Sequence, residues 1–222
     1  MIETATTTSG GTATVTLTYD LMGNIASKSD AGSYTYGETH SGTCTSGHAG
    51  PHAVTTVSLP KDATYCYDAN GNMTSGDGRA VSYTAFDKPA QIVKGTSTIA
   101  VSYGPDRSRF KRVDTTATGT VTTVYVGGKA YEQINRAGVI ERKVYIGDFA
   151  VVTETGPTGS TTLATSYFLR DHLGSIDVIT DELGTVLEQM SFDSWGKRRN
   201  VDWTPMVNPT AYLTTLDRKS VV

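Results

Sequence analysis

The sequence predicts an all-β protein in which repeated antiparallel β-hairpins form one continuous, curved sheet. Three observations support this fold class: the composition, short stretches of alternating polarity, and a motif that recurs at a step of roughly twenty residues. Threonine accounts for 37 of the 222 residues, tyrosine for 12 and glycine for 23. Threonine and tyrosine favour pleated strands, and glycine supplies the sharp reversals between them.

Local patterns place several strands. Residues 12–19 alternate threonine with alanine, valine, leucine and tyrosine, which is the period of two expected for a half-buried strand. Hairpins with glycine-containing turns are predicted over residues 124–131, 144–152 and 178–187. No stretch of a dozen residues shows helical periodicity. The strands are therefore expected to follow one another through tight turns.

The recurring motif is an aromatic residue followed by Asp, two further residues and then often Gly. From Asp68 the steps to Asp87 and Asp106 are both 19 residues, and Phe86-Asp87 and Asp106 are interpreted as weaker copies. The clearest copies contain Tyr19, Asp20, Gly23 and Asn24; Tyr67, Asp68, Gly71 and Asn72; Asp171 and Gly174; Asp181 and Gly184; and Phe192, Asp193, Trp195 and Gly196. This step fits two short strands with two turns, or one hairpin per repeat.

Each residue type in the motif suits a tight turn. The Asp carboxylate can accept a hydrogen bond from the backbone N–H two residues further on, and Gly can adopt the positive φ that such a turn requires. The aromatic residues of neighbouring hairpins would stack into cross-strand ladders. Metal binding or acid–base catalysis by these aspartates is the alternative. A structural role is favoured because a catalytic group would not be expected to recur in every hairpin.

Changes in composition predict four segments. Residues 1–12 are expected to be a disordered N-terminal segment, and residues 13–155 to hold the hairpin repeats with a Gly-rich insertion at 37–53. Residues 156–200 form a separate core segment that opens on a hairpin tip at 156–162. Residues 201–222 are expected to be an irregular tail, because Pro205 and Pro209 cannot lie inside a central strand.

Charge and hydropathy exclude several classes of protein. The net charge of −3 comes from 19 basic and 22 acidic residues, so no nucleic-acid partner is expected. The basic cluster at residues 197–199 is interpreted as a solvated loop. No apolar run is long enough to span a bilayer, and the N-terminus lacks the features of a signal peptide. Cys44 and Cys66 do not make a disulfide framework, and they leave the compartment undefined.

One group of residues has the composition of a zinc site. His40, Cys44, His48 and His52 recur every four residues, and Cys66 lies further along the chain. Zinc takes such donors. However, the intervening Gly, Ser, Thr and Pro residues oppose the helix that would align them, so a flexible loop is the favoured interpretation.

A second group begins like a calcium-binding loop. Asp68, Asn70 and Asn72 have the spacing of the first ligands, but Met73 stands where the loop needs Gly and Arg79 where it needs Glu. The sequence contains no Gly-rich phosphate loop and no hydrolase signature. We therefore predict no catalytic, cofactor-binding or metal-binding residues, and a protein that is not an enzyme.

The repeats resemble the rearrangement-hotspot (Rhs), or tyrosine/aspartate-repeat, family. The strongest similarity covers residues 167–184 and continues over 191–198, and it is similar to the family's signature core segment. Residues 34–37 together with 50–54 also look like a family repeat that carries an insertion. In total the resemblance covers about residues 13–200.

This resemblance implies a structural segment of a β-shell that encloses and delivers a C-terminal toxin. The implied partners are the toxin polypeptide or the remaining repeats of the parent protein, which would be secreted or displayed on the cell surface. The family's self-cleavage region follows the core segment, and this sequence ends at 217–222, about where that region would begin. No catalytic residue is therefore carried over. A shell fragment would leave strand edges unpaired, so we expect self-association or aggregation.

A carbohydrate-binding or cell-surface adhesive module is the alternative function. Exposed aromatic residues on a β-surface can stack on sugar rings, and Trp195 and Trp203 lie near the end of the core segment.

Overall fold

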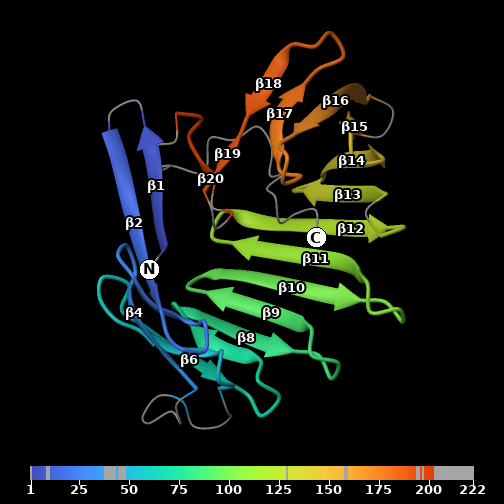
Figure 1. Ribbon diagram of the computed structural model, residues 1–222. Helices are drawn as coiled ribbons and strands as arrows, with labels where there is room; N and C mark the ends of the chain where they lie inside the picture. Colours follow the sequence, from blue (N-terminus) through green and yellow to red (C-terminus); the bar gives the residue numbers. More distant parts are fainter. Residues whose placement is uncertain are drawn as a thin grey trace. The chain divides into compact units, whose positions relative to one another are not determined.

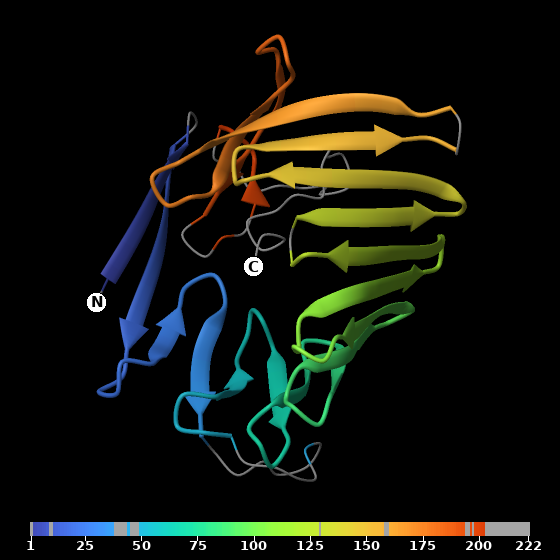
Figure 2. The same cartoon turned by 90° about the vertical axis from the view of Figure 1, so that its right-hand side faces the viewer.

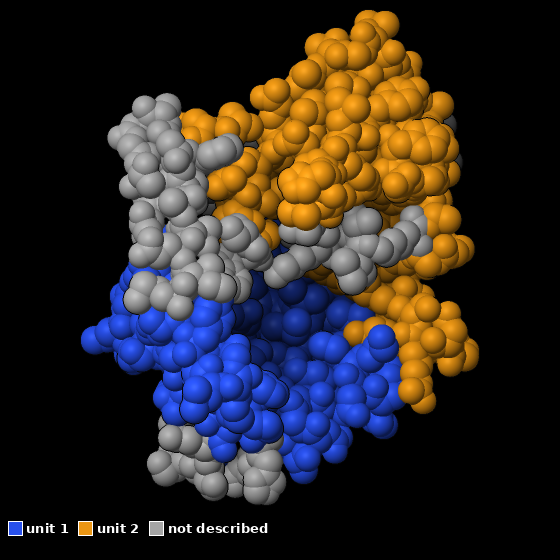
Figure 3. All heavy atoms as spheres, in the orientation of Figure 1, with its two compact units in different colours: residues 1–7, 11–101, 113–119 blue, residues 8–10, 102–112, 120–222 orange. Residues whose placement is uncertain are grey.

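The computed structural model describes residues 2–8, 11–37, 44, 49–128, 130–157, 160–193, 196 and 198–202. All regular elements within these ranges are β-strands, which confirms the predicted all-β class (Figure 1). In the same ranges no helix has the length and hydropathy needed to cross a membrane. The chain divides into two compact units (Figure 3). Unit 1 comprises residues 1–7, 11–101 and 113–119, and unit 2 comprises residues 8–10, 102–112 and 120–222.

Unit 1 is a succession of antiparallel hairpins in which each strand pairs with the next one in the chain. Its strands are β2 (Gly11–Tyr19), β3 (Ile25–Lys28), β4 (Gly32–Tyr36), β5 (Val54–Val57), β6 (Ala63–Tyr67), β7 (Met73–Gly76), β8 (Arg79–Tyr83), β9 (Pro89–Lys94) and β10 (Ser97–Tyr103). Strands β4 and β5 end and begin on either side of the predicted Gly-rich insertion.

Unit 2 continues with the same connectivity, which is seen from yellow-green to orange in Figure 2. Its strands are β12 (Gly119–Val126), β13 (Tyr131–Arg136), β14 (Val139–Ile146), β15 (Ala150–Thr155), β16 (Thr162–Arg170), β17 (Ile176–Thr180), β18 (Val186–Gln189), β19 (Ser191–Phe192) and β20 (Arg198–Arg199). Strand β11 (Arg109–Thr116) contributes residues to both units, as do the C-terminal end of β10 and the first residue of β12. The three hairpins predicted over residues 124–131, 144–152 and 178–187 are confirmed.

The N-terminal residues differ from the expectation of disorder over 1–12. Strand β1 covers Ile2–Thr8, and β2 begins at Gly11. The physical reason lies in the composition, since residues 2–8 contain four threonines and an isoleucine, and β-branched residues favour extended backbone.

Strands β15 and β16 pair with each other from Thr155↔Thr162 onward, which confirms the hairpin predicted around residues 156–162. One further expectation needs correction, because the basic cluster is not a free loop. Arg198 and Arg199 form β20, which pairs with β19, and Arg198 makes an ion pair with Glu188. A short hairpin closed at Gly196 brings these arginines back onto the preceding strand.

A β-bulge accompanies six of the repeated turns, and its extra residue lies in the strand that follows the turn. The strand register shifts at Tyr19, Tyr67 and Tyr83 in unit 1, and again at Arg170 and Thr180 in unit 2. A sixth bulge of the same kind lies where β4 pairs with β5. A bulge adds one residue to one strand and increases the local twist. Its recurrence at the same place identifies one structural unit that repeats along the chain.

The core of unit 2 lies on one face of its sheet. Val151, Phe168, Ile176, Ile179 and Met190 form a buried cluster, in which Ile179 is 1% exposed. In unit 1 the buried residues are more scattered and include the polar residues Asn24 and Thr55. The Thr55 hydroxyl donates to the Thr35 carbonyl at 3.1 Å. A lean hydrophobic core thus coexists with many hydrogen-bonded turns.

Candidate functional site

The repeated Asp turn is the most regular chemical feature of the chain. In the copy that begins at Asp68, one carboxylate oxygen accepts the backbone N–H groups of Asn70 and Asn72, both at 2.9 Å. The Asp68 N–H donates to the Asn72 carbonyl at 2.9 Å, and the Gly71 N–H donates to the Asp68 carbonyl at 3.1 Å. Gly71 has a φ of +84°, in the left-handed region that favours glycine. One carboxylate therefore satisfies two inward-facing donors of a five-residue reversal.

The same pattern appears at the other strong copies of the motif. The first residue of the turn accepts from the N–H groups of the third and fifth residues at 2.8 or 2.9 Å, in the turns that begin at Asp20, Asp171 and Asp181. The glycines at the fourth position are Gly23, Gly174 and Gly184, with φ between +78° and +82°. In the copy at Asp193, the Gly196 N–H donates to the Asp193 carbonyl at 2.9 Å, and Trp195 lies outside the described residues.

The two weaker copies have a different register from the predicted one. The turn assigned to Asp87 begins at Thr84, and Asp87 occupies the glycine position with a φ of +60°. The turn assigned to Asp106 begins at Gly104, with Arg107 at the glycine position, also at +60°. The first-position carboxylate is replaced by the Thr84 hydroxyl in one turn and by the Asp106 carboxylate in the other. The prediction placed the start of each turn at an Asp residue. The backbone turn also accepts a hydroxyl, or a carboxylate from another position, as the hydrogen-bond acceptor.

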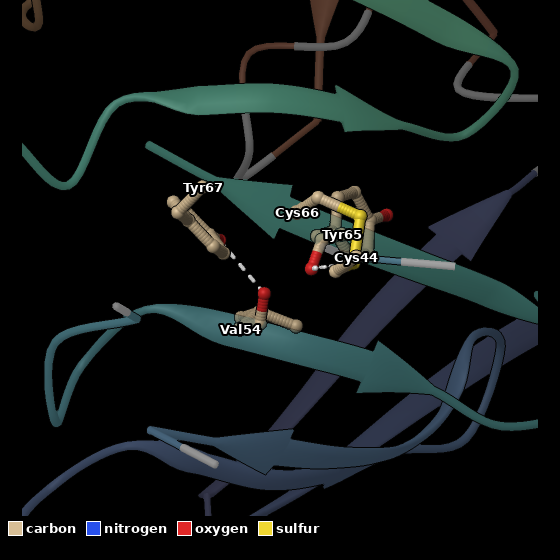
Figure 4. Close-up of a disulfide and its surroundings, with 5 residues drawn as sticks. All are labelled: Cys44, Val54, Tyr65, Cys66 and Tyr67. Atoms are coloured by element: carbon tan, nitrogen blue, oxygen red, sulfur yellow. Dashed lines mark hydrogen bonds between the residues drawn. A yellow bond between two sulfur atoms is a disulfide. The ribbon is translucent and has the colours of Figure 1, made fainter. Parts of the chain in front are cut away.

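A tyrosine links each turn of unit 1 to the preceding one. The residue before the turn donates its hydroxyl to the carbonyl of the first residue after the previous turn. The pairs are Tyr36 to Ile25 at 2.9 Å, Tyr67 to Val54 at 2.7 Å, and Tyr83 to Met73 at 2.9 Å. The second of these bonds is drawn in Figure 4. Burial raises the pKa of all three hydroxyls, which therefore stay protonated donors. The aromatic residue of the motif therefore connects neighbouring repeats through its hydroxyl group.

The Gly-rich insertion interrupts one copy of the turn, as two hydrogen bonds on either side of the Ala53–Val54 peptide show. Gly37 follows Tyr36, and its N–H donates to the Ala53 carbonyl at 3.2 Å, as the first residue of a turn does to the fifth. Val54 then accepts the hydroxyl of Tyr67. The insertion was predicted as a loop, but its place inside a motif copy was not.

Side chains also connect neighbouring turns. Asn24 donates its amide to the carboxylate of Asp20 at 3.0 Å and to the Pro51 carbonyl at 3.2 Å, so its Oδ1 is an acceptor. His52 Nδ1 lies 2.6 Å from that oxygen and is therefore the donor. Asn24 is 8% exposed. A hydrogen-bonded chain from Asp20 through Asn24 to His52 thus joins the first turn to the second.

The equivalent link between the third and fourth turns uses Asp87. The amide groups of Asn70 and Asn72 both donate to its Oδ1, at 2.9 and 2.8 Å. These amides present N–H donors where a calcium ion would need oxygen ligands. Within the residues that the structure describes, no group of three or more His, Cys, Asp and Glu could hold a metal ion. His40 and His48 lie outside those residues, and Cys44 and Cys66 are joined to each other in a disulfide.

The sheet of unit 2 has two different faces. Side chains directly opposite each other in neighbouring strands lie on the same face, and successive residues alternate between faces. Val151, Phe168 and Ile179 share the core face. The opposite face, here called the open face, is defined by Val126, Val144, Ile146, Tyr167 and Leu169. These five side chains are 41–57% exposed. The open face therefore presents several large apolar groups to solvent.

The core face also carries charged groups away from the apolar cluster. Glu141 accepts from Arg136 and Lys143 at 3.0 and 2.9 Å. The Tyr145 hydroxyl lies 3.4 Å from a carboxylate oxygen of Glu132, and burial together with that charge raises the pKa of Tyr145. These groups are compensated ion pairs and hydrogen bonds.

One residue that sequence reasoning missed is Arg170. Its guanidinium donates twice to the Asp148 carbonyl, at 3.0 and 2.9 Å, and once to the Gly174 carbonyl at 2.8 Å. Arg170 stands where other copies carry the aromatic residue. It joins the turn between β14 and β15 to the turn between β16 and β17. The planar fork of arginine suits such simultaneous contacts.

Comparisons with known proteins identify no relative, since no protein-family model matches the chain and no curated protein matches it.

The left-handed residue of the turn gives a test with a matched control. A Cβ added at Gly71 or at Gly50 would meet no atom within 4 Å, but only Gly71 has a positive φ. Gly71→Ala should lower the free energy of unfolding by about 1–2 kcal/mol, because an L-residue is strained in that conformation. Gly50→Ala should leave it unchanged or slightly raised. Urea denaturation measures both, and equal effects of the two substitutions would contradict the assigned turn.

The tyrosine connector gives a second test. Tyr83→Phe removes the hydroxyl that satisfies the Met73 carbonyl, and it should lower the free energy of unfolding by about 1 kcal/mol. Tyr34→Phe is the control, since Tyr34 lies nearby in unit 1 and its hydroxyl donates to no described residue; its effect should stay within about 0.5 kcal/mol. If both variants unfold at the same urea concentration as the parent, the hydroxyl link does not hold the repeats together.

The turn carboxylates give a pH dependence. The backbone N–H of Thr185 is the largest influence on Asp181 and holds the pKa of this carboxyl below its ordinary value of 3.8. The pKa of Asp68 is lowered in the same way by the N–H of Asn72. A lowered folded pKa gives stability that is present above the unfolded pKa and is lost as pH falls through the folded pKa.

We therefore expect the free energy of unfolding to fall as the pH is reduced from about 5 to about 2. Asp181→Asn keeps an acceptor oxygen but lacks the charge, so it should be less stable than the parent at neutral pH and lose less stability on acidification. Parallel curves for the parent and this variant in acid denaturation would show that the carboxylate charge contributes nothing.

Proposed function

We propose that this chain is a structural, non-enzymatic repeat segment of an Rhs-type shell protein, and that it encloses a polypeptide cargo such as a toxin domain. The observation that carries the proposal is the regular link between repeats. Each connecting tyrosine of unit 1 donates to the carbonyl that follows the previous turn. Such an array gains stability from contacts between neighbours and extends by adding further copies. This arrangement supports a scaffold, which matches the resemblance of its motif to the tyrosine/aspartate repeats.

The open face supports a polypeptide partner. Monomeric soluble proteins rarely expose contiguous apolar patches, and such patches mark interaction sites. Four of its five defining side chains, Val126, Val144, Ile146 and Leu169, are aliphatic, whereas Tyr167 and the half-buried Tyr131 on the same face are aromatic. Sugar rings stack on aromatic faces, whereas apolar segments of an unfolded chain pack on aliphatic ones. The composition of the open face therefore favours a non-native polypeptide over a glycan.

In this proposal the parent protein acts outside the cell or at its surface. The chain contributes sheet area and contact surface, and it requires no cofactor. Its action on the cargo is steric, because a continuous sheet keeps the enclosed polypeptide away from solvent and proteases.

Binding to a permanently unfolded polypeptide tests this function. Fluorescently labelled, reduced and carboxymethylated α-lactalbumin should bind the purified chain in an anisotropy titration. The double substitution Val144→Ser/Ile146→Ser should weaken binding at least tenfold, which corresponds to about 1.4 kcal/mol. Leu183→Ser is the matched control, because Leu183 is an apolar side chain with 91% exposure that lies in a turn outside the open face.

The two candidate functions predict different results in the polypeptide titration and on a glycan array. Binding that depends on Val144 and Ile146 and is not displaced by sugars supports the shell. Absence of polypeptide binding, combined with binding on a glycan array, would replace the shell with the adhesive module.

A further inference from the structure

The disulfide of the chain joins two neighbouring repeats. Cys44 lies in the insertion within the second turn, and Cys66 lies in β6, the strand that leads into the third turn. Their Cα atoms are 5.4 Å apart, within the usual range for a disulfide. Figure 4 shows the bond beside Tyr65 and Tyr67. Cys44 and Cys66 are 8% and 9% exposed, so the bridge is buried.

The bridge duplicates a link that is already present without it. Tyr67, the residue next to Cys66, donates its hydroxyl to the Val54 carbonyl at 2.7 Å and so joins the same two repeats. Strand β6 pairs with β5 through Thr64↔Thr56 and with β7 through Cys66↔Ser75. These backbone and hydroxyl contacts do not need the sulfur–sulfur bond. The disulfide therefore adds a covalent constraint to an interface that hydrogen bonds already define.

We propose that Cys44–Cys66 is a redox-controlled lock between the second and third repeats, which closes when the chain reaches an oxidising compartment. Disulfides persist in secreted and cell-surface proteins and are kept reduced in the cytosol. The closing reaction is thiol–disulfide exchange. A small disulfide such as glutathione disulfide, or an oxidoreductase disulfide, takes up the two thiol hydrogens and becomes two thiols, while the two cysteine sulfurs form one bond.

The open state of the lock is compatible with the fold. Cys44 Sγ lies 3.8 Å from the Tyr65 carbonyl, which gives the reduced thiol an acceptor. With the bond open, the two repeats are joined by hydrogen bonds alone, and local opening between them becomes easier. With the bond closed, 22 residues of chain are tied into a loop and the opened ensemble is restricted. This inference goes beyond the proposed function, because it holds whatever the parent protein encloses.

Hydrogen exchange of the purified chain tests the lock. The chain is equilibrated with an excess of either glutathione disulfide or reduced glutathione, and free thiols are counted by alkylation and mass spectrometry. We expect no free thiol in the first case and two in the second. Exchange of the β5 and β6 amides should be at least tenfold faster in the reduced chain. Strands β14 and β15 of unit 2 are the internal control and should exchange equally in both.

Cys44→Ser and Cys66→Ser should each reproduce the reduced pattern under oxidising conditions, which separates the bond from the thiols themselves. Three results would overturn the proposal. Two alkylated cysteines in excess glutathione disulfide would show that the bond does not form. A bond that survives excess reduced glutathione would be a permanent cross-link, not a lock. Equal exchange of β5 and β6 in both states would show that the bond does not restrain the two repeats.

Discussion

The closed five-residue turn is the constraint on which the rest of the structure depends. A reversal this tight directs two backbone N–H groups inward, and buried donors without acceptors are costly. In the strong copies a single carboxylate oxygen, such as that of Asp68, accepts both. Six of the turns are accompanied by a bulge in the adjoining strands. Because the bulge fixes the register, the turn also decides which side chains share a face of the sheet.

Many contacts between neighbouring turns then contribute to the stability of the chain. The tyrosine hydroxyls, the Asn24–His52 contact and the Asp87 contacts each connect one turn to its neighbour. This explains how a chain with only 37% hydrophobic residues can form extended sheets without a large central core. The Cys44–Cys66 bond reinforces one of these contacts between neighbouring repeats, which hydrogen bonds also form elsewhere in the chain.

Much of this architecture could be read from the sequence, and the parts that could not have identifiable causes. The hairpins and the turn chemistry of Asp20, Asp68, Asp171 and Asp181 follow from local residue preferences. The register of the turns that begin at Thr84 and Gly104 was predicted wrongly. Neither turn has Asp at its first position, and the prediction used the nearest Asp. The disulfide was not anticipated, because the pairing of two cysteines depends on where an irregular insertion meets a strand.

The faces of the sheet show the limit of pattern reasoning most clearly. Alternation along a strand defines two faces but does not say which one is buried, and in unit 2 both carry apolar residues. The structure assigns the core to the face of Val151 and Phe168, where β17 and the buried Met190 complete a cluster. An antiparallel sheet that was solvated on its other side would place polar residues there. The aliphatic side chains of the open face depart from that arrangement, and the polypeptide partner proposed above would cover them.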